Sequence, residues 1–251
     1  MKHGYNEPHY SKEKERRMLR HVLRITAFLL VLATADLGIA QTSSPELKTL
    51  KEVSDFIQTY YLHPQPEVIG NVIEALRPSG YLQKRNNINP LVGFFSKIFA
   101  ANPNWLPEWQ LLIAKQDEQT KAALDLALSA NKTGGVLNNI SDHAAGVNDV
   151  YWGAFFARGN PKFVHRLVDQ LRFFDERDDQ ALFFAGATAM WSLASVAQTQ
   201  PAVRSAIEEA KPKADKRTQE LISELLTQDP ESIKQEMRDI VRHQQEAGKW
   251  K

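Results

Sequence analysis

The feature that most constrains the fold is a pattern that recurs around four prolines. Each proline has apolar residues five and four positions before it, and again two and six positions after it. The prolines are Pro66, Pro103, Pro161 and Pro201, and the apolar residues that follow them are Val68 and Val72, Trp105 and Trp109, Phe163 and Leu167, and Val203 and Ile207. Residues four apart share one helix face, and proline is favoured at the first helical position. The pattern predicts four helical hairpins in which these side chains are core anchors.

The spacing of the prolines indicates how the hairpins combine. The intervals from position 66 to 103, from 103 to 161 and from 161 to 201 are on the scale of the units in tetratricopeptide or HEAT-like arrays. Residues able to cap a helix precede proline at 160–161, 200–201 and 229–230, whereas strand signals are scarce. We therefore expect an all-α fold, an irregular α-solenoid of antiparallel helical hairpins with about nine or ten helices. A nonrepetitive helical domain is the alternative.

The N-terminal segment 1–40 has the layout of an export signal. A basic start after Met18 precedes an apolar run at 25–35, and small residues lead up to Ala40. We expect cleavage between Ala40 and Gln41. The run is shorter than the roughly 20 apolar residues of a membrane span, which makes an uncleaved anchor the weaker alternative. The polar stretch before Met18 is unusual for a signal peptide and favours translation from Met18 over Met1. The mature chain is expected to be periplasmic or secreted, without a stable membrane span.

Composition excludes several function classes. The chain has no cysteine, which rules out disulfides, thiol nucleophiles, iron–sulfur clusters and thiolate zinc sites. The net charge is +1, and the excess of basic residues lies in the segment 1–40, beyond which acidic residues slightly outnumber basic ones. This balance provides no basic face for nucleic acid. We expect no cofactor and no nucleic-acid partner.

Three segments follow from these patterns. Residues 1–40 form the signal peptide, and 41–212 form the domain of hairpin repeats. Its first helix is expected to open at Ser44-Pro45. Residues 213–251 are rich in charge and are expected to form a solvated C-terminal helical hairpin.

Few residues suggest chemistry. The four histidines that follow the leader are His63, His143, His165 and His243, and no two have the four-residue spacing of a zinc-binding helix face, so we predict no metal site. The densest polar cluster is Asp142, His143 and Asp149, which offers two carboxylates and an imidazole for acid–base catalysis. The favoured interpretation is helix capping by Asp142 and by Asn148 or Asp149.

Aromatic side chains crowd the central hairpins, and helix packing accounts for most of them. Neighbouring pairs such as Phe155-Phe156 point to different sides of a helix, so some rings can line a groove for a peptide. The candidates for such a groove are Trp152, Phe156, Arg158 and Trp191.

The segments DVYWGAFFARGNPKFVHRLVDQL and AGATAMWSLASVAQTQPAVRSAIEEA resemble a group of exported bacterial proteins with helical-hairpin repeats. The likeness covers roughly 148–210, and more loosely 56–76, and implies no reaction, ligand or functional residue. We expect a non-catalytic module that binds a protein or peptide. The alternatives are an enzyme that uses Asp142, His143 and Asp149, and a secreted effector that acts on a host partner.

Overall fold

The computed structural model describes residues 47–133 and 145–250. The expected signal peptide and its cleavage site, and the candidates Asp142 and His143, lie outside these residues. Within the described ranges there are eleven α-helices and no strand, which confirms the all-α class and exceeds the nine or ten helices expected.

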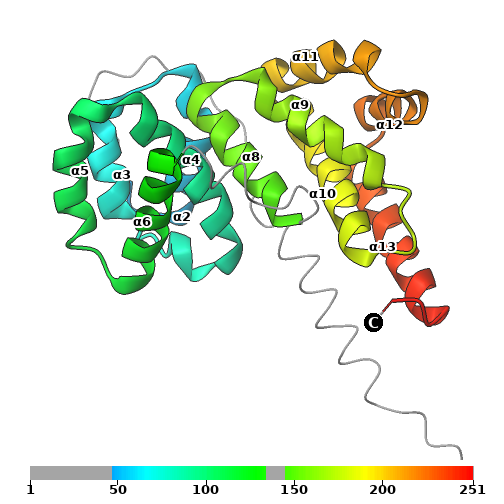
Figure 1. Cartoon of the computed structure of the whole chain (residues 1–251), viewed down its shortest axis with the longest axis horizontal. Coiled ribbons are helices and arrows are strands. Elements are labelled where there is room, and N and C mark those ends of the chain that lie inside the picture. The colour runs from blue at the N-terminus through cyan, green and yellow to red at the C-terminus, as the bar shows by residue number, and fades with distance from the viewer. Residues whose placement is uncertain (1–46, 134–144, 251) are drawn as a thin grey trace, which may run out of the picture.

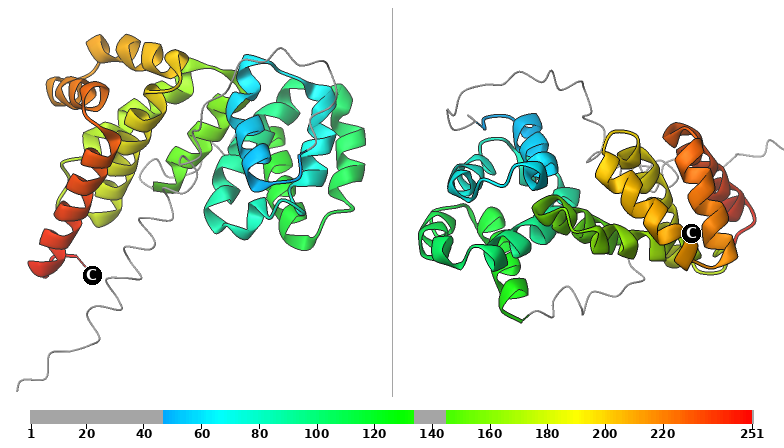
Figure 2. Two further views of the ribbon diagram at one scale, coloured as in Figure 1. Left: turned by 180° about the vertical axis from the view of Figure 1, so that it is seen from behind. Right: turned by 90° about the horizontal axis from the view of Figure 1, so that it is seen from above.

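The helices form two groups, with α8 between them (Figure 1). The first group comprises α2 (Leu50–Thr59), α3 (Ile69–Ala75), α4 (Ile88–Ala101), α5 (Leu106–Ile113) and α6 (Glu118–Thr133). Next come α8 (Ala145–Arg158) and the second group, α9 (Pro161–Gln170), α10 (Gln180–Ala197), α11 (Pro201–Ala210), α12 (Lys216–Thr227) and α13 (Pro230–Glu246). Figure 2 shows the same grouping from behind and from above.

Side-chain caps fix several helix starts. Asn160 accepts from the backbone N–H of Lys162 at the start of α9, and Asp229 caps α13 in the same way, as predicted. Gln200 does not cap α11; its Oε1 accepts a hydrogen bond from the hydroxyl of Tyr61 at 2.9 Å instead. The first described helix begins at Leu50, where Thr49 and Glu52 form a capping box, and the expected opening at Ser44-Pro45 lies outside the described residues.

Helices α4 and α8 approach until their backbones touch. A Cβ built on Gly93 of α4 would collide with the carbonyl oxygen of Val150, and a Cβ built on Gly153 of α8 would collide with the carbonyl oxygen of Pro90. Only glycine permits so close an approach without displacing a helix. This contact joins the first group of helices to α8.

The α8 and α10 helices run in the same direction and are joined by two side-chain hydrogen bonds. Asn148 Nδ2 donates to Thr188 Oγ1 at 2.9 Å, and Trp152 Nε1 donates to Ser192 Oγ at 3.0 Å. Each pair is separated by 40 residues, which is also the interval from Pro161 to Pro201. The following helices α9 and α11 pack on each other as well. The two hairpins are therefore stacked with equivalent positions side by side.

Two of the close contacts between α4 and α8 share one offset. Gly93 lies against Val150 and Asn89 lies against Gly146 at the same separation along the chain, whereas Gly153 meets Pro90 and Phe94 at longer separations. The corresponding prolines, at 103 and 161, have nearly that separation too. This offset is longer than the one between α8 and α10, and the additional length is occupied in part by α6, which packs on α4.

The C-terminal helices are more closely integrated than a solvated hairpin. Both α12 and α13 pack on α10 through a stripe of buried residues: Leu221, Ile222, Leu225, Ile233, Met237 and Val241. Beyond α13, the indole of Trp250 is buried, donates from Nε1 to the carbonyl oxygen of Arg177 at 3.0 Å and lies 4.9 Å from the ring of Phe183. Most charged residues of these helices lie on their outer faces because the inner faces complete the core, but Lys234 of α13 is buried with its Nζ 5.5 Å from the ring centroid of Trp191.

Helix α10 is the central element of the second group. It contacts α8, α9, α11, α12 and α13. By length and composition it is apolar enough to cross a membrane, but 72% of it is buried inside the structure. An apolar helix enclosed by other helices is what a protein core requires.

Candidate functional site

Three of the four residues that the sequence predicted to line an aromatic groove are buried in the core. Trp152 and Trp191 are each 3% exposed, and Phe156 is fully buried. The rings of Trp152 and Phe156 stack on each other with centroids 5.7 Å apart. Only Arg158, in the last turn of α8, is exposed. The three rings fill the space between hairpins, which is the packing role that large aromatic side chains often have.

The repeat anchors behave largely as expected. Six of the eight are buried, namely Val68, Val72, Trp109, Leu167, Val203 and Ile207, whereas Trp105 and Phe163 are only partly buried. Pro161 and Pro201 begin α9 and α11, while Pro66 and Pro103 begin the short 3-10 helices η3 (Pro66–Val68) and η6 (Pro103–Trp105). Phe163 lies at the edge of the core, where Lys97 Nζ is 5.5 Å from its ring centroid.

Asn148 and Asp149 lie inside α8, so neither is the cap of that helix. Asn148 is buried and reaches across to α10 instead. Although Asp149 is partly exposed, desolvation of its carboxyl group raises the pKa of that group to about 8. Burial, together with the nearby Asp149, also holds the pKa of the Tyr81 hydroxyl well above its usual value. The convergence of Asp149 with Asp142 and His143 remains a hypothesis because those two residues lie outside the described ranges.

The described histidines belong to different elements of the fold. His63 is exposed at the end of the 3-10 helix η2 (Tyr60–Leu62), and His165 Nε2 on α9 lies 4.0 Å from Glu209 Oε2 on α11. His243 belongs to α13. Among residues 47–133 and 145–250, no three histidine or acidic side chains come together as a set of metal ligands.

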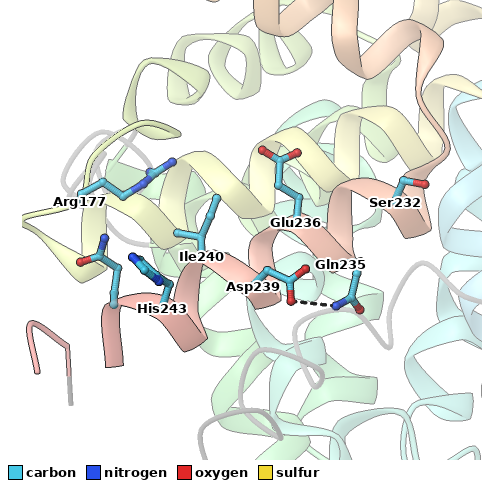
Figure 3. Close-up of a pocket in the computed structure, with 8 residues that line it drawn as sticks. Arg177, Ser232, Gln235, Glu236, Asp239, Ile240 and His243 are labelled. Atoms are coloured by element: carbon cyan, nitrogen blue, oxygen red, sulfur yellow. Dashed lines mark hydrogen bonds between the residues drawn. The ribbon is translucent and has the colours of Figure 1, made fainter. Parts of the chain in front are cut away.

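A surface depression of about 600 Å³ lies beside α13 (Figure 3). It is lined by Arg177, Ser232, Gln235, Glu236, Asp239, Ile240, His243 and Gln244. All but Arg177 come from α13, at spacings of one, three and four positions that place them on one side of the helix. Arg177 comes from the turn that precedes α10 and forms the opposite wall.

The side chain of Arg177, which forms the wall opposite α13, is fixed by contacts within the protein. Its Nη1 donates to the carbonyl oxygens of Phe174 at 2.6 Å and Glu176 at 3.2 Å, and its guanidinium lies 5.0 Å from the ring centroid of Phe183. The same Arg177 supplies the carbonyl that accepts from Trp250. These contacts fix the rim of the depression.

Two of the remaining polar groups of the depression are carboxylates. Asp239 pairs with Arg242 and accepts from Gln235 Nε2 at 3.0 Å, whereas the exposed Glu236 carboxylate makes no ion pair with any described residue. Gln244 is 9% exposed, and its buried Oε1 has no hydrogen-bond partner among the described residues. A buried acceptor left without a donor costs free energy, and this atom is itself not accessible from the depression.

Sequence reasoning missed this depression because α13 alone has the pattern of an ordinary amphipathic helix with a charged outer face. The concave shape depends on the turn that carries Arg177, which lies far earlier in the chain than α13. The signal that would have pointed to it is Ile240, an apolar residue among the polar residues of that face.

Comparison of the chain with protein-family models, with curated proteins and with solved structures finds no match.

Proposed function

We propose that this chain is an exported helical-repeat protein that binds a protein or peptide partner and acts non-catalytically. The observation that carries the proposal is the stacking of the α8–α9 hairpin on the α10–α11 hairpin with a constant offset of 40 residues. Such translational stacking is how solenoid repeats bury their cores, and extended solenoid surfaces commonly bind other proteins.

The irregular solenoid of this proposal contains unequal units. The equal offset of two of the contacts between α4 and α8, Gly93 with Val150 and Asn89 with Gly146, supports the inclusion of the earlier hairpin, with α6 as an insertion. At the other end, α12 and α13 pack on α10 and direct most of their charged side chains outward, with the buried Lys234 as an exception. A polar outer face is what a terminal repeat needs in order to end the array in water.

We propose that the protein is located in the periplasm or outside the cell. It rests on the leader-like pattern of residues 1–40, in which a basic start, a short apolar run and small residues at Ala40 follow in order. After cleavage no stable membrane span is expected, and α10 is a core helix rather than an anchor.

Site-specific photo-crosslinking in the cell envelope tests the function. A photoreactive residue is placed at exposed positions, one at a time: Gln235 on α13, Glu208 on α11 and Leu111 on α5. The proposal expects a discrete protein adduct from one contiguous face, which excess unlabelled protein competes away. Adducts from no position, or equal adducts from all three, would contradict it.

A further inference from the structure

We propose that the exposed start of α9, together with Lys97 of α4, binds an acidic peptide segment whose two carboxylates lie on alternate residues. The inference rests on the proposed function, because it names the chemistry of the partner segment. The surface consists of Lys97, Lys162, Phe163 and Arg166, and we call it the α9 patch.

The positive charge on α9 is arranged differently from that on three other helices. On those helices a cation pairs with an acid four positions later. The pairs are Lys51–Asp55, Lys121–Asp125 and Arg204–Glu208. On α9 the residue four positions after Lys162 is Arg166, so two cations share one exposed face, and like charges at this spacing are unfavourable. Neither side chain forms an ion pair with a described residue, which leaves both available to an external anion.

Lys97 extends this positive surface from a second helix. Its Nζ lies 5.5 Å from the ring centroid of Phe163, and its side chain is partly buried. Burial, and after it the nearby ammonium of Lys162, lowers the pKa of Lys97. No carboxylate of a described residue pairs with Lys97 to offset these effects. A carboxylate bound between the two lysines would offset both the repulsion and the desolvation.

The α9 patch has the dimensions for two carboxylates of one extended peptide. Lys162 and Phe163 lie four and three positions before Arg166, which puts the three side chains on one side of the helix. Cβ atoms four positions apart on a helix are about 5–6 Å apart. Alternate residues of an extended chain point to the same side and are about 7 Å apart. The first carboxylate can thus lie between the lysines while the second reaches the guanidinium of Arg166.

A peptide suits this arrangement better than a single phosphate ion. The cations are spread along a turn of α9 rather than directed at one point, so a small anion contacts only one end of the patch. The guanidinium of Arg166 can hold a carboxylate by two parallel hydrogen bonds. Between the two ends, the partly buried ring of Phe163 offers an apolar surface to the peptide chain.

An NMR titration of the protein tests the proposal. The ligand is an acetylated, amidated peptide of alanine and glycine with two glutamates on alternate residues, and the control peptide has glutamines in their place. We expect saturable shifts of the backbone amide signals of Lys162, Phe163 and Arg166 with the glutamate peptide and none with the glutamine peptide. Inorganic phosphate at the same ionic strength is the third ligand. Phosphate that binds as tightly as the glutamate peptide would overturn the assignment to a peptide.

Two variants and a control separate a site from general charge attraction. Lys162→Gln and Lys97→Met should each weaken binding of the glutamate peptide about fivefold, because one ion pair with the ligand is lost. Lys216→Gln removes an exposed lysine from the first turn of α12, far along the chain from the α9 patch, and should leave binding unchanged. Lys162→Gln should also raise the pKa of Lys97, which carbon-13 NMR of the lysine side chain measures.

The unfolding midpoint shows that weaker binding is not a loss of fold. It should stay the same or rise in Lys162→Gln and Lys97→Met, because each removes a repulsion between cations. A lower midpoint in both, equal losses of binding in Lys216→Gln and Lys162→Gln, equal shifts with the glutamine peptide, or no saturable shift would overturn the proposal. A partner crosslinked in the envelope together with no response to the glutamate peptide would overturn this inference and leave the proposed function standing.

Discussion

Trp152 and Ser192, forty positions apart in the chain, share a hydrogen bond in which the indole Nε1 donates to the serine hydroxyl at 3.0 Å. Both residues are buried, and they occupy equivalent places in consecutive hairpins. The bond therefore serves two purposes: it satisfies the one polar group of a core indole, and it fixes the register in which α8 and α10 stack.

Ser192→Ala should lower the free energy of unfolding by about 1–3 kcal/mol, because it leaves the buried N–H of Trp152 without an acceptor. The matched control is Ser195→Ala, because among the described residues the Ser195 hydroxyl bonds only to the Trp191 carbonyl of its own helix. Its cost should be below about 1 kcal/mol. Urea unfolding monitored by circular dichroism measures both. Equal effects would mean that the hydrogen bond to Trp152 contributes nothing specific.

Gly153→Ala should be strongly destabilising, by about 1–3 kcal/mol or more, because its new methyl group meets the backbone of α4 at Pro90 and Phe94. Gly70→Ala provides the comparison. There the methyl group lies 3.1 Å from the flexible Leu112 Cδ1, and helix propensity favours alanine by about 1 kcal/mol. Thermal unfolding should give a lower midpoint for the first variant and a similar or higher one for the second. A tolerated Gly153→Ala would contradict the backbone contact.

Asp149 should make stability depend on pH. Its folded pKa is raised from 3.8 to about 8, so between these values the folded carboxyl keeps a proton that the unfolded one has lost. The contribution of the protonated Asp149 carboxyl to the free energy of unfolding is complete below about pH 4. It declines as pH rises and is gone above about pH 8. Asp149→Asn should flatten this decline and exceed the parent in stability at about pH 9. The exposed Asp178→Asn is the control, and an unchanged slope in Asp149→Asn would disprove the assignment.

Leu167→Ala should cost about 2–5 kcal/mol, because the side chain is fully buried between hairpins. Phe163→Ala, which the sequence pattern alone would place in the same range, should cost below about 2 kcal/mol because its ring is only partly buried beside Lys97. Guanidinium unfolding of the two variants tests the order. A larger loss in Phe163→Ala would mean that the ring is more central than the structure indicates.

N-terminal sequencing of the exported protein should find Gln41 as the first residue. The reason is the signal-peptide layout that ends at Ala40. Fractionation of cells and Edman degradation of the envelope fraction provide the measurement. A chain that begins at Met1 or Met18 in that fraction would overturn the proposed location.

Much of the fold follows from local sequence. The proline pattern identified the helices α9 and α11, and six of its eight anchors are buried. Local patterns predicted less well the roles of side chains that contact other helices. Asn148 resembles a helix cap, but it bonds to Thr188 on a later helix, and the concave face beside α13 depends on Arg177. These roles arise from tertiary contacts, which periodicity within one helix does not encode.

The central position of α10 affects how the protein unfolds locally. In an extended array, each unit touches only its neighbours and the ends can open alone. Here α10 touches α8, α9, α11, α12 and α13, so none of its partners detaches without exposing the same apolar helix. The second half of the molecule should thus behave as one cooperative unit, with the backbone amides of α10 exchanging their hydrogens last.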